Sequence, residues 1–510
     1  MIQMALHRVV AIGLMLALSA CAPKVVEVAK PRSAAFSDTG DTFLASRARA
    51  LGDPGNGTSG VRLVASGPEA LALRLLLSER AERSIDAQYY ILHNDTTGHL
   101  FAGELLRAAD RGVRVRLLLD DMYTAEYDPM TAALTRHPNI EIRLFNPFRR
   151  DIGRVLGGLL EFGRINRRMH NKSMTFDNQV TLVGGRNIGD EYFAAREDSN
   201  YDDLDLLAAG PVVRDVSAVF DDYWNSPYAI PADVLIGPMP ALSTEDARAR
   251  MQALYEAAKL TEYGSALDHE IRAQLQSARL QLDWVPAQVE SDPPDKAGRS
   301  EASVLADDLL PVLQAADSEL VVASAYFVPG PRGTALLTGL ARRGIRVTIL
   351  TNSMDSNDVE PVHAHYSKYR KALLEAGVEL WELRPNKERP DRTLLQLGQS
   401  LSGLHSKAFA VDERHFFIGS FNWDPRSVAL NTEMGILIDA PRVTRAAIRE
   451  WRAGLPDAAY RLVLTETGEI AWLEKREDGS WTGYGREPTS SGWRRFRMGL
   501  YRTLPIRRQL

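Results

Sequence analysis

Residues 170–187 read HNKSMTFDNQVTLVGGRN, and residues 405–422 read HSKAFAVDERHFFIGSFN. Histidine, lysine, aspartate, glycine and asparagine recur in the two stretches at the same spacing, each displaced by 235 positions. From ordinary residue usage, one copy of this five-residue pattern arises by chance roughly once in ten thousand chains of this length. Two copies in register therefore indicate a duplicated unit whose polar residues act together.

The duplication extends beyond this motif. SIDAQYYIL, which starts at Ser84, is similar to ELVVASAYF, which starts at Glu319, and RGVRVRLLL at Arg111 is similar to RGIRVTILT at Arg343. Such apolar runs are typical of buried strands, and stretches with helical character lie between them. Strands that alternate with helices predict an α/β fold built in layers, here present twice.

These patterns divide the chain into six parts. We predict a signal peptide over residues 1–20, a flexible tether over 21–60, a first α/β domain over 61–235, a helical connector over 236–279, a second α/β domain over 280–460, and a C-terminal β extension with a basic tail over 461–510. The second domain is expected to open with a strand in LQLDWVPAQ, directly after the connector.

The N-terminus has the form of an export signal. A weakly basic start is followed by an apolar run that is too short to span a bilayer as a mature helix, and then by Leu18-Ser19-Ala20-Cys21. Cys21 is the only cysteine, so no internal disulfide is possible. The ending resembles a bacterial lipoprotein signal, which predicts lipid attachment at Cys21; the alternative is an ordinary secretory signal with an incidental cysteine.

Charge is distributed unevenly along the chain. The net charge is −5, and residues 493–510 contain six arginines and no acidic residue, which leaves −11 on the rest of the molecule. An acidic body is a poor electrostatic match for nucleic acid. The composition thus argues against a nucleic-acid partner, although the tail is basic.

The motif residues suit a phosphate ester. In a strand, side chains two positions apart share a face, so the histidine and the lysine of each motif point the same way. Lysine and asparagine are suited to hold non-bridging phosphate oxygens, while histidine attacks phosphorus or transfers a proton. Phosphodiester exchange needs both a nucleophile and an acid for the leaving alcohol, and two motifs supply two imidazoles.

The pattern H-x-K-x4-D-x6-G-[G/S]-x-N, present twice, resembles the phospholipase D superfamily. The strings HNKSMTFDNQVTLVGGRNIGDEYF and LHSKAFAVDERHFFIGSFNWDPRSVALNTEMG resemble the C-type bacterial cardiolipin synthases within it. The resemblance covers nearly everything from about residue 60 onward. It implies two phospholipase D-like α/β/α sandwich domains related by a pseudo-two-fold axis, with both motifs in one cleft, and chemistry that needs neither metal nor cofactor.

The resemblance also implies roles for individual residues. His170 is expected to be the nucleophile that forms a phosphatidyl-histidine, and His405 the acid that protonates the departing alcohol and later deprotonates the incoming one. The groups expected to hold the phosphoryl oxygens are Lys172, Lys407, Asn187 and Asn422. Because the two halves are nearly equivalent, the opposite assignment of nucleophile and acid stays open.

Supporting residues are expected around this set. The motif aspartates, Asp177 and Asp412, are expected to brace the strand and turn. Each imidazole needs a carboxylate on its far nitrogen. Glu433 matches the family position in the second half. In the first half we choose Asp203, with Asp202 and Asp205 as alternatives. The family pattern pairs each carboxylate with the histidine of the opposite domain. Gly185 stands where the second copy has Ser420, a difference that either distinguishes the two halves or has no effect.

Two further segments allow alternative interpretations. In VHAHY, His363 and His365 could form a metal pair on a strand, but the surrounding sequence predicts a helix, on which these residues do not share a face. The tail WRRFRMGLYRTLPIRRQL places Trp493, Phe496, Leu500 and Leu504 at helical spacing among arginines. Such a helix is suited to lie on anionic lipid, or alternatively to pack its apolar stripe on the protein.

Together these features predict a lipid-anchored phosphatidyltransferase that makes cardiolipin from phosphatidylglycerol and a second phospholipid. The alternatives are a hydrolase that releases phosphatidate, a nuclease or other phosphodiesterase, and a non-catalytic lipid-binding lipoprotein. The expected partners are phospholipid substrates and an anionic membrane surface, with any helper protein unidentified and the monomer as the working unit. The expected location is a bacterial membrane facing the periplasm, with the outer membrane favoured in a Gram-negative cell.

Overall fold

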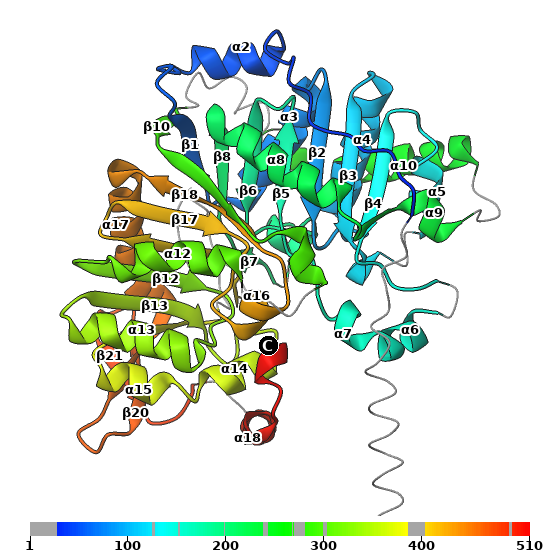
Figure 1. Ribbon diagram of the computed structural model, residues 1–510. Coiled ribbons are helices and arrows are strands. Elements are labelled where there is room, and N and C mark those ends of the chain that lie inside the picture. Colours follow the sequence, from blue (N-terminus) through cyan, green and yellow to red (C-terminus); the bar gives the residue numbers. More distant parts are fainter. Residues whose placement is uncertain are drawn as a thin grey trace, which may run out of the picture.

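The computed structural model describes residues 28–124, 128–150, 153–197, 199–237, 243–267, 269, 281–298, 303–385, 403–488 and 492–510. The predicted signal peptide and Cys21 lie outside these residues. Two large mixed sheets, each with helices packed against it, form the body of the molecule (Figure 1).

The first sheet has nine strands in the order β10-β1-β8-β6-β5-β2-β3-β4-β9. Their bounds are β1 (Ser59–Val64), β2 (Ser84–Tyr89), β3 (Arg114–Asp120), β4 (Ile140–Phe145), β5 (Ser173–Phe176), β6 (Val180–Gly184), β8 (Asp205–Ala209), β9 (Ala229–Pro231) and β10 (Asp283–Val285). Only the pairs β2–β3 and β3–β4 are parallel. Helices connect these parallel strands, which is the reason for the strand–helix alternation in the sequence.

The second sheet has ten strands in the order β11-β18-β17-β16-β12-β13-β14-β19-β20-β21. Their bounds are β11 (Ala287–Ser291), β12 (Glu319–Ser324), β13 (Arg346–Asn352), β14 (Glu379–Leu383), β16 (Lys407–Val411), β17 (His415–Gly419), β18 (Met434–Asp439), β19 (Ala459–Leu464), β20 (Ile470–Lys475) and β21 (Trp481–Tyr484). The parallel pairs are again the three consecutive strands β12, β13 and β14. The predicted β extension is therefore continuous with the second sheet, because β19 pairs with β14.

The helices cover these sheets and link them. They are α2 (Phe43–Ala50), α3 (Gly67–Arg80), α4 (Thr96–Asp110), α5 (Asp128–Leu134), α6 (Arg154–Leu160), α7 (Phe162–Ile165), α8 (Pro211–Asn225), α9 (Ala232–Ile236), α10 (Thr244–Lys259), α12 (Val304–Gln314), α13 (Gly330–Arg342), α14 (Glu360–Tyr366), α15 (Arg370–Glu375), α16 (Pro425–Ala429), α17 (Pro441–Ala458) and α18 (Gly492–Thr503). Short 3-10 turns include η1 (Asp121–Tyr123), η3 (Asp190–Tyr192), η4 (Pro294–Ala297) and η5 (Arg507–Gln509). Among the described residues, no helix combines the length and the apolar character that crossing a bilayer requires.

A shared apolar core joins the two domains. It contains Leu206 and Ala208 of β8 together with Ile436 and Ile438 of β18, all fully buried. In addition, β7 (Tyr201–Asp202) of the first half pairs in parallel with β15 (Gly403–Leu404) of the second half. Because burial of apolar surface is the main stabilising contribution in folding, this shared core stabilises the packing of the two halves against each other.

The boundary between the domains differs from the prediction in one respect. We expected residues 280–288 to open the second domain, but β10 (Asp283–Val285) pairs with β1 of the first sheet. The chain joins the second sheet at β11, which follows Pro286 and pairs with β18. Proline lacks the N–H that a continuous ladder needs, so the strand divides there between the two sheets.

The flexible tether predicted over residues 21–60 is wrong for its described part. The main chain near residue 33 lies along the first domain, where Arg143 donates to Pro31 O (2.7 Å) and Arg116 donates to Ser33 O (3.2 Å). The guanidinium groups of Arg116 and Arg143 are buried, and the carbonyl groups of this segment satisfy part of their hydrogen-bonding capacity. The segment is ordered because these arginines need acceptors, and α2 follows it.

The connector packs on the first domain through α10. The Tyr255 hydroxyl donates to Glu104 on α4 (3.1 Å), and a Cβ added at Gly103 would lie 2.4 Å from the Tyr255 ring. The absence of a side chain at Gly103 is what allows α4 and α10 to approach so closely. Residues 238–242, 268 and 270–279 of the predicted connector lie outside the described residues.

The VHAHY segment is a helix, as predicted. In α14, His363 Nε2 lies 3.0 Å from Glu487 Oε1, whereas His365 Nδ1 lies 3.3 Å from Lys368 Nζ. The two imidazoles thus have different partners. Within the described part of the chain, no group of three or more histidine, cysteine, aspartate or glutamate side chains is arranged to hold a metal ion.

Candidate active site

The two motif histidines lie just before corresponding strands, β5 and β16. Each histidine is only 7% exposed. The main chain of each one is hydrogen-bonded to the other domain: His170 N donates to Thr432 O (2.9 Å), and His405 N donates to Asp202 O (2.8 Å). Each motif is therefore held at the domain interface by the opposite half of the molecule.

Each imidazole is also hydrogen-bonded to a carboxylate of the opposite domain. His170 Nδ1 lies 2.8 Å from Glu433 Oε2, and His405 Nδ1 lies 2.5 Å from Asp203 Oδ2. A carboxylate accepts from the Nδ1–H tautomer, which leaves the lone pair on Nε2. Both rings are thereby prepared to react at phosphorus, or with a proton, through Nε2.

The neighbouring aspartates of NYDDLDLL have other partners. Asp202 contributes its main-chain oxygen to His405 N, as described above, and Asp205 forms a buried ion pair with Arg74 (2.9 Å). Among the three aspartates considered from the sequence, Asp203 is the one whose carboxylate contacts the histidine.

Glu433 is held by hydrogen bonds to Ser420 and to two residues that were not predicted from the sequence, Ser427 and Asp292. Ser420 Oγ donates to Oε2 (2.5 Å), Ser427 Oγ donates to Oε1 (2.8 Å), and Glu433 N donates to Asp292 Oδ2 (3.1 Å). Burial opposes ionisation of Glu433, but His170, the charge of Lys172 and the hydrogen bond from Ser420 hold its pKa below the ordinary value. The carboxylate is therefore charged and fixed in orientation.

The difference between Gly185 and Ser420 has a steric cause. A Cβ added at Gly185 would lie 2.1 Å from Asp203 Oδ1, a distance that real Cβ atoms do not reach. Asp203 Oδ1 instead accepts from Leu204 N (2.8 Å). In the second half the equivalent serine fits and donates to the longer side chain of Glu433. The two halves thus use different means to position an equivalent carboxylate.

The motif lysines are buried beside their own histidines. Lys172 Nζ donates to His170 O (2.6 Å), and Lys407 Nζ donates to His405 O. Burial lowers the pKa of Lys407 to about 8 and holds that of Lys172 well below its ordinary value, and the charge of Lys407 lowers the Lys172 pKa further. An anion bound between these ammonium groups would relieve this electrostatic cost.

The motif asparagines are buried as well. Asn187 Oδ1 accepts from Ile91 N (3.2 Å), and its side chain also hydrogen-bonds the hydroxyl of Tyr192. Asn422 is 3% exposed, and its Oδ1 has no hydrogen-bond partner among the described residues. Buried amide groups are normally paired, so Asn422 is available to a ligand.

Aromatic rings pack against both imidazoles. Tyr90 lies edge-on to His170 with ring centroids 5.2 Å apart, while Tyr192 and Tyr201 lie 5.1 and 5.2 Å from His405. Burial among these rings lowers the pKa of His170 to about 4, and burial together with Lys407 lowers that of His405 to about 3. Both histidines are therefore neutral near pH 7 when no substrate is bound.

Asp120 and Asn352, which were not predicted as site residues, support the two motifs at equivalent positions. Asp120 Oδ2 accepts from Met169 N (2.8 Å), and Asn352 Oδ1 accepts from Leu404 N (2.8 Å). Each therefore holds the residue directly before a motif histidine, at the end of the third buried strand of its half. The repeat itself carried a signal, because RGVRVRLLLD and RGIRVTILTN both end in a side chain with an acceptor oxygen.

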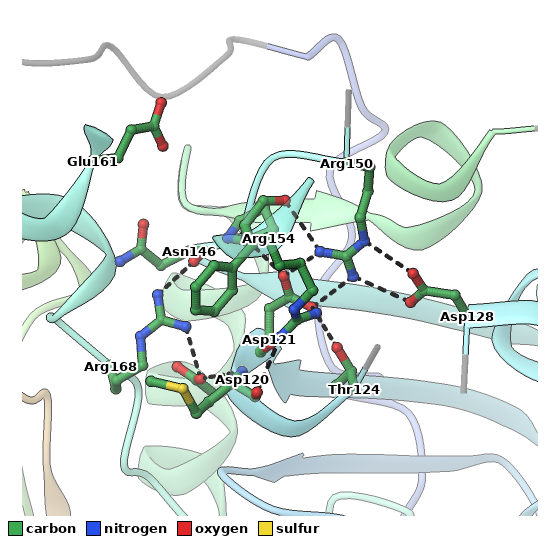
Figure 2. Close-up of polar contacts among 12 residues, drawn as sticks. Asp120, Asp121, Thr124, Asp128, Asn146, Arg150, Arg154, Glu161 and Arg168 are labelled. Carbon is green, nitrogen blue, oxygen red and sulfur yellow. Dashed lines mark hydrogen bonds and ion pairs between the residues drawn. The ribbon is translucent and has the colours of Figure 1, made fainter. Parts of the chain in front are cut away.

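A cluster of arginines and aspartates lies next to Asp120 in the first half (Figure 2). Arg168 Nη1 donates to Asp120 Oδ1 (3.0 Å), and Arg150 lies between Asp121 (2.6 Å) and Asp128 (2.9 Å). Arg154 donates to the main chain of Asp121. Multiple charge-assisted hydrogen bonds of this kind fix the loop after β4 to the end of β3.

The motif aspartates lie in tight turns away from the histidines. Asp177 accepts from the main-chain N–H groups at the start of β2, with its closest bond to Arg83 N (2.7 Å), and Asp412 accepts likewise from Ser318 N (2.8 Å) at the start of β12. Their φ angles are 50° and 55°, in the left-handed region that aspartate tolerates better than most residues. This geometry supports the bracing role that we expected.

We predict that Gly185→Ser is more damaging than Ser420→Gly. The added Cβ displaces Asp203, so His405 loses its orienting partner, and turnover should fall about 10- to 100-fold. Ser420→Gly removes one of several hydrogen bonds to Glu433 and should cost less than about tenfold. The measurement is the rate of product formation by each purified variant, with circular dichroism to verify folding. Equal losses would contradict the steric explanation.

We also predict that the buried histidines reduce stability in acid. Both titrate near pH 6.5 when unfolded but near 4 and 3 when folded, so the unfolded chain binds more protons between these values. Their contribution is complete above pH 6.5 and is lost as the pH falls, by up to roughly 1.4 kcal/mol per pH unit for each histidine. Denaturant unfolding of His170→Ala/His405→Ala should show a shallower pH dependence from 6.5 to 4.5. Asn422→Ala, which removes no titrating group, should keep the original slope.

Comparison with known proteins agrees with this geometry. A sequence family described as "Cardiolipin synthase, PLD-like domain" matches residues 76–224 and 309–453, one match in each half. Cardiolipin synthase C of Escherichia coli (strain K12) is 40% identical over 453 residues, which cover 86% of this chain and 93% of that protein. Cardiolipin synthase of Geobacillus kaustophilus (strain HTA426) is 27% identical over 382 residues, covering 74% of this chain and 62% of that protein.

The fold is also found in a solved structure. The crystal structure of phosphatidylserine synthase from Haemophilus influenzae Rd KW20 matches with a TM-score of 0.54 and 16% identity, over 82% of this chain and 91% of that chain. The predicted two-domain α/β fold is thereby confirmed. From the two family matches and the 40% identical relative, we conclude that the chain is an enzyme of the phospholipase D superfamily and belongs to its cardiolipin synthase-type family.

Proposed function

We propose that this enzyme transfers a phosphatidyl group from one phospholipid to a hydroxyl of phosphatidylglycerol and so makes cardiolipin. The observation that carries the proposal is the reciprocal pairing of His170 with Glu433 and of His405 with Asp203 across the domain interface. This pairing gives one site two oriented imidazoles, as a two-step exchange at phosphorus requires. The names of the similar proteins support cardiolipin as the product.

In the first step, His170 Nε2 attacks the phosphorus of the donor phospholipid. The new P–N bond forms as the P–O bond to the head-group alcohol breaks, and His405 gives its Nε2 proton to the departing oxygen. Lys172, Lys407 and the motif asparagines neutralise the charge on the non-bridging oxygens. The product is a phosphatidyl-histidine and a free alcohol.

In the second step, His405 removes the proton from a hydroxyl of phosphatidylglycerol. That oxygen attacks phosphorus, the P–N bond breaks, and His170 is released unchanged. If water is the acceptor instead, the product is phosphatidate. The low exposure of the two histidines limits the access of water and therefore favours transfer over hydrolysis.

The protonation states fit these roles. His170 is neutral at physiological pH because burial lowers its pKa to about 4, so its Nε2 lone pair is available for attack. His405 must carry a proton in the first step. A phosphodiester anion bound beside His405 raises its pKa toward the physiological range, because a nearby negative charge favours the imidazolium.

The lipid substrates place the enzyme at a membrane. We propose that a lipid attached to Cys21 anchors the chain on the periplasmic side, in the outer membrane of a Gram-negative cell. The export-type N-terminus and the basic tail support a membrane location, and Ala22, in place of an aspartate after Cys21, favours the outer membrane.

The prediction that tests the function is a product analysis with defined lipids. Vesicles of phosphatidylglycerol alone, and of phosphatidylglycerol with phosphatidylethanolamine, are incubated with the purified enzyme. Cardiolipin should form, with free glycerol in the first case, or free ethanolamine if phosphatidylethanolamine is a donor. His170→Ala should reduce the rate at least about a thousandfold, because it removes the nucleophile. Mass spectrometry of the lipids provides the measurement.

His415→Ala is the matched control, since His415 lies on β17 outside the site and the same side-chain change should leave turnover intact. Phosphatidate as the main product would establish the hydrolase instead. Cleavage of plasmid DNA without any lipid product would establish the nuclease.

We predict that the covalent intermediate forms on His170. His405→Ala retains the nucleophile but lacks the general base for the second step, so a phosphatidyl-histidine should accumulate when a donor with an activated leaving group is supplied. Peptide mapping by mass spectrometry would locate the adduct. An adduct on His405 in the His170→Ala variant, together with no adduct on His170 in the His405→Ala variant, would reverse the assignment of the two roles.

A further inference from the structure

One end of the molecule carries exposed apolar side chains from both domains. On α18, Trp493, Phe496 and Leu500 are 67%, 63% and 55% exposed, and Leu504 just after the helix is 38% exposed. The Trp493 and Phe496 rings stack on each other at 5.5 Å. Isolated exposed apolar residues are common, but an apolar stripe along one helix marks an interaction surface.

The other side of α18 is attached to the second domain. Arg494 pairs with Asp355 (2.8 Å), Arg497 pairs with Glu360 (2.7 Å), and Met498 is buried. The helix thus uses two of its arginines and a methionine to bind the body of the protein. Its apolar stripe faces outward and is not used for internal packing.

The first domain adds a second apolar projection. Leu160 at the end of α6 and Phe162 at the start of α7 are each 57% exposed. The segment that carries them is fixed at its base, where Arg154 donates to the main chain of Asp121 and Arg164 Nη1 donates to Asn146 Oδ1 (2.6 Å). An anchored loop with exposed apolar residues is suited to insert into a partner surface, because little conformational entropy is lost on binding.

The two projections lie at the same end of the molecule (Figure 1). Asn166, the C-cap of α7, donates to the side chain of Gln509, and Arg426 of α16 contacts both Asn166 Oδ1 (3.0 Å) and Gln509 O (3.2 Å). The end of α7 is therefore in direct contact with the C-terminal turn that follows α18. Residues far apart in sequence form one continuous end.

This end is positively charged. Residues 493–510 contain no acidic residue, and Arg502 and Arg507 are exposed. Lys368, also exposed, lies near both; partial burial and then the charges of Arg502 and Arg507 lower its pKa. Exposed cations that repel one another favour an anionic partner.

The same end lies close to the candidate active site. Tyr123 of η1 is 47% exposed, and its ring lies edge-on to Tyr90 at 5.8 Å; Tyr90 in turn lies edge-on to His170 at 5.2 Å. Arg154, which anchors the α6–α7 segment, also donates to Met122 O (3.0 Å) within η1. The segment that carries Leu160 and Phe162 is thus connected through η1 to Tyr90, the ring that packs against His170.

We propose that Leu160, Phe162, Trp493, Phe496, Leu500 and Leu504 form a docking face that inserts into the surface of an anionic phospholipid bilayer. The apolar side chains enter the region between head groups and acyl chains, while Arg502, Arg507 and Lys368 contact the phosphates. The proposal rests on the proposed function for its lipid partner. It adds that both domains contact the bilayer, which fixes the orientation of the active site toward it.

The first experiment uses the single cysteine of the chain. Cys21→Ser removes both the proposed lipid-attachment site and the native thiol. A single new cysteine then carries an environment-sensitive fluorophore at one position, through Phe162→Cys, Phe496→Cys or Leu260→Cys. Leu260 is the control because it is 86% exposed and lies after α10. All three variants also carry His170→Ala, so docking is measured without turnover.

On vesicles that contain phosphatidylglycerol, positions 162 and 496 should show a blue shift and increased intensity, and position 260 should not. On pure phosphatidylcholine vesicles, binding should be at least about tenfold weaker, because each basic residue near an anionic surface adds to the affinity. A response at 496 without one at 162 would overturn the two-domain face. A response that depends on protein concentration without vesicles would assign the surface to a second copy of the chain and overturn the proposal as well.

The second experiment separates docking from chemistry. Leu160→Ser/Phe162→Ser and Phe496→Ser/Leu500→Ser should each reduce turnover on vesicles at least about tenfold, because burial of apolar surface drives docking. Both should turn over short-chain phospholipids dissolved as monomers at the wild-type rate, as should Leu260→Ser. Equal losses on monomers and vesicles would contradict docking. No lipid product from the wild type on either substrate would refute the proposed function, while the fluorophores would still decide whether the face binds.

Discussion

Each motif histidine is hydrogen-bonded through Nδ1 to a carboxylate that belongs to the other domain, and these two bonds connect the fold to the chemistry. Neither half contains a complete site, because His170 depends on Glu433 and His405 depends on Asp203. The core shared by β8 and β18 and the pairing of β7 with β15 keep the carboxylates within reach. Domain packing therefore fixes the partner of each imidazole as well as stabilising the fold.

Burial determines the electrostatics of the site. Two lysines and two histidines lie together with two carboxylates. Burial lowers the pKa of each lysine and histidine by more than the neighbouring carboxylates raise it. A site that is costly to charge when empty becomes favourable when an anion enters, since the phosphodiester supplies the missing negative charge. This electrostatic cost is consistent with the proposed phosphate ester substrate. Tyr90, Tyr192 and Tyr201 contribute by keeping the imidazoles away from water.

The two halves have diverged around the same scaffold. Asp120 and Asn352 support the motif histidines from equivalent positions, but Asp120 is charged and paired with Arg168, whereas Asn352 is neutral. Gly185 makes room for Asp203, whereas Ser420 donates to Glu433. Only the second sheet continues into β19–β21 and the tail. A duplicated fold has in this way acquired distinct surroundings for two histidines whose expected roles in the reaction differ.

Strand periodicity and the doubled spacing identify the duplicated unit and the histidine, lysine and asparagine of each half, because such patterns repeat over a few residues. Local patterns do not predict contacts between residues that are distant in the sequence. Residues near 33 were predicted to be a tether, but they accept hydrogen bonds from Arg116 and Arg143. The sequence by itself thus determined the α/β repeat and the groups that are predicted to react. Only the tertiary structure decided which carboxylate contacts which histidine, because the partners lie 202 and 263 residues apart in the sequence. It also decided which side of α18 stays exposed, because that depends on packing against the second domain.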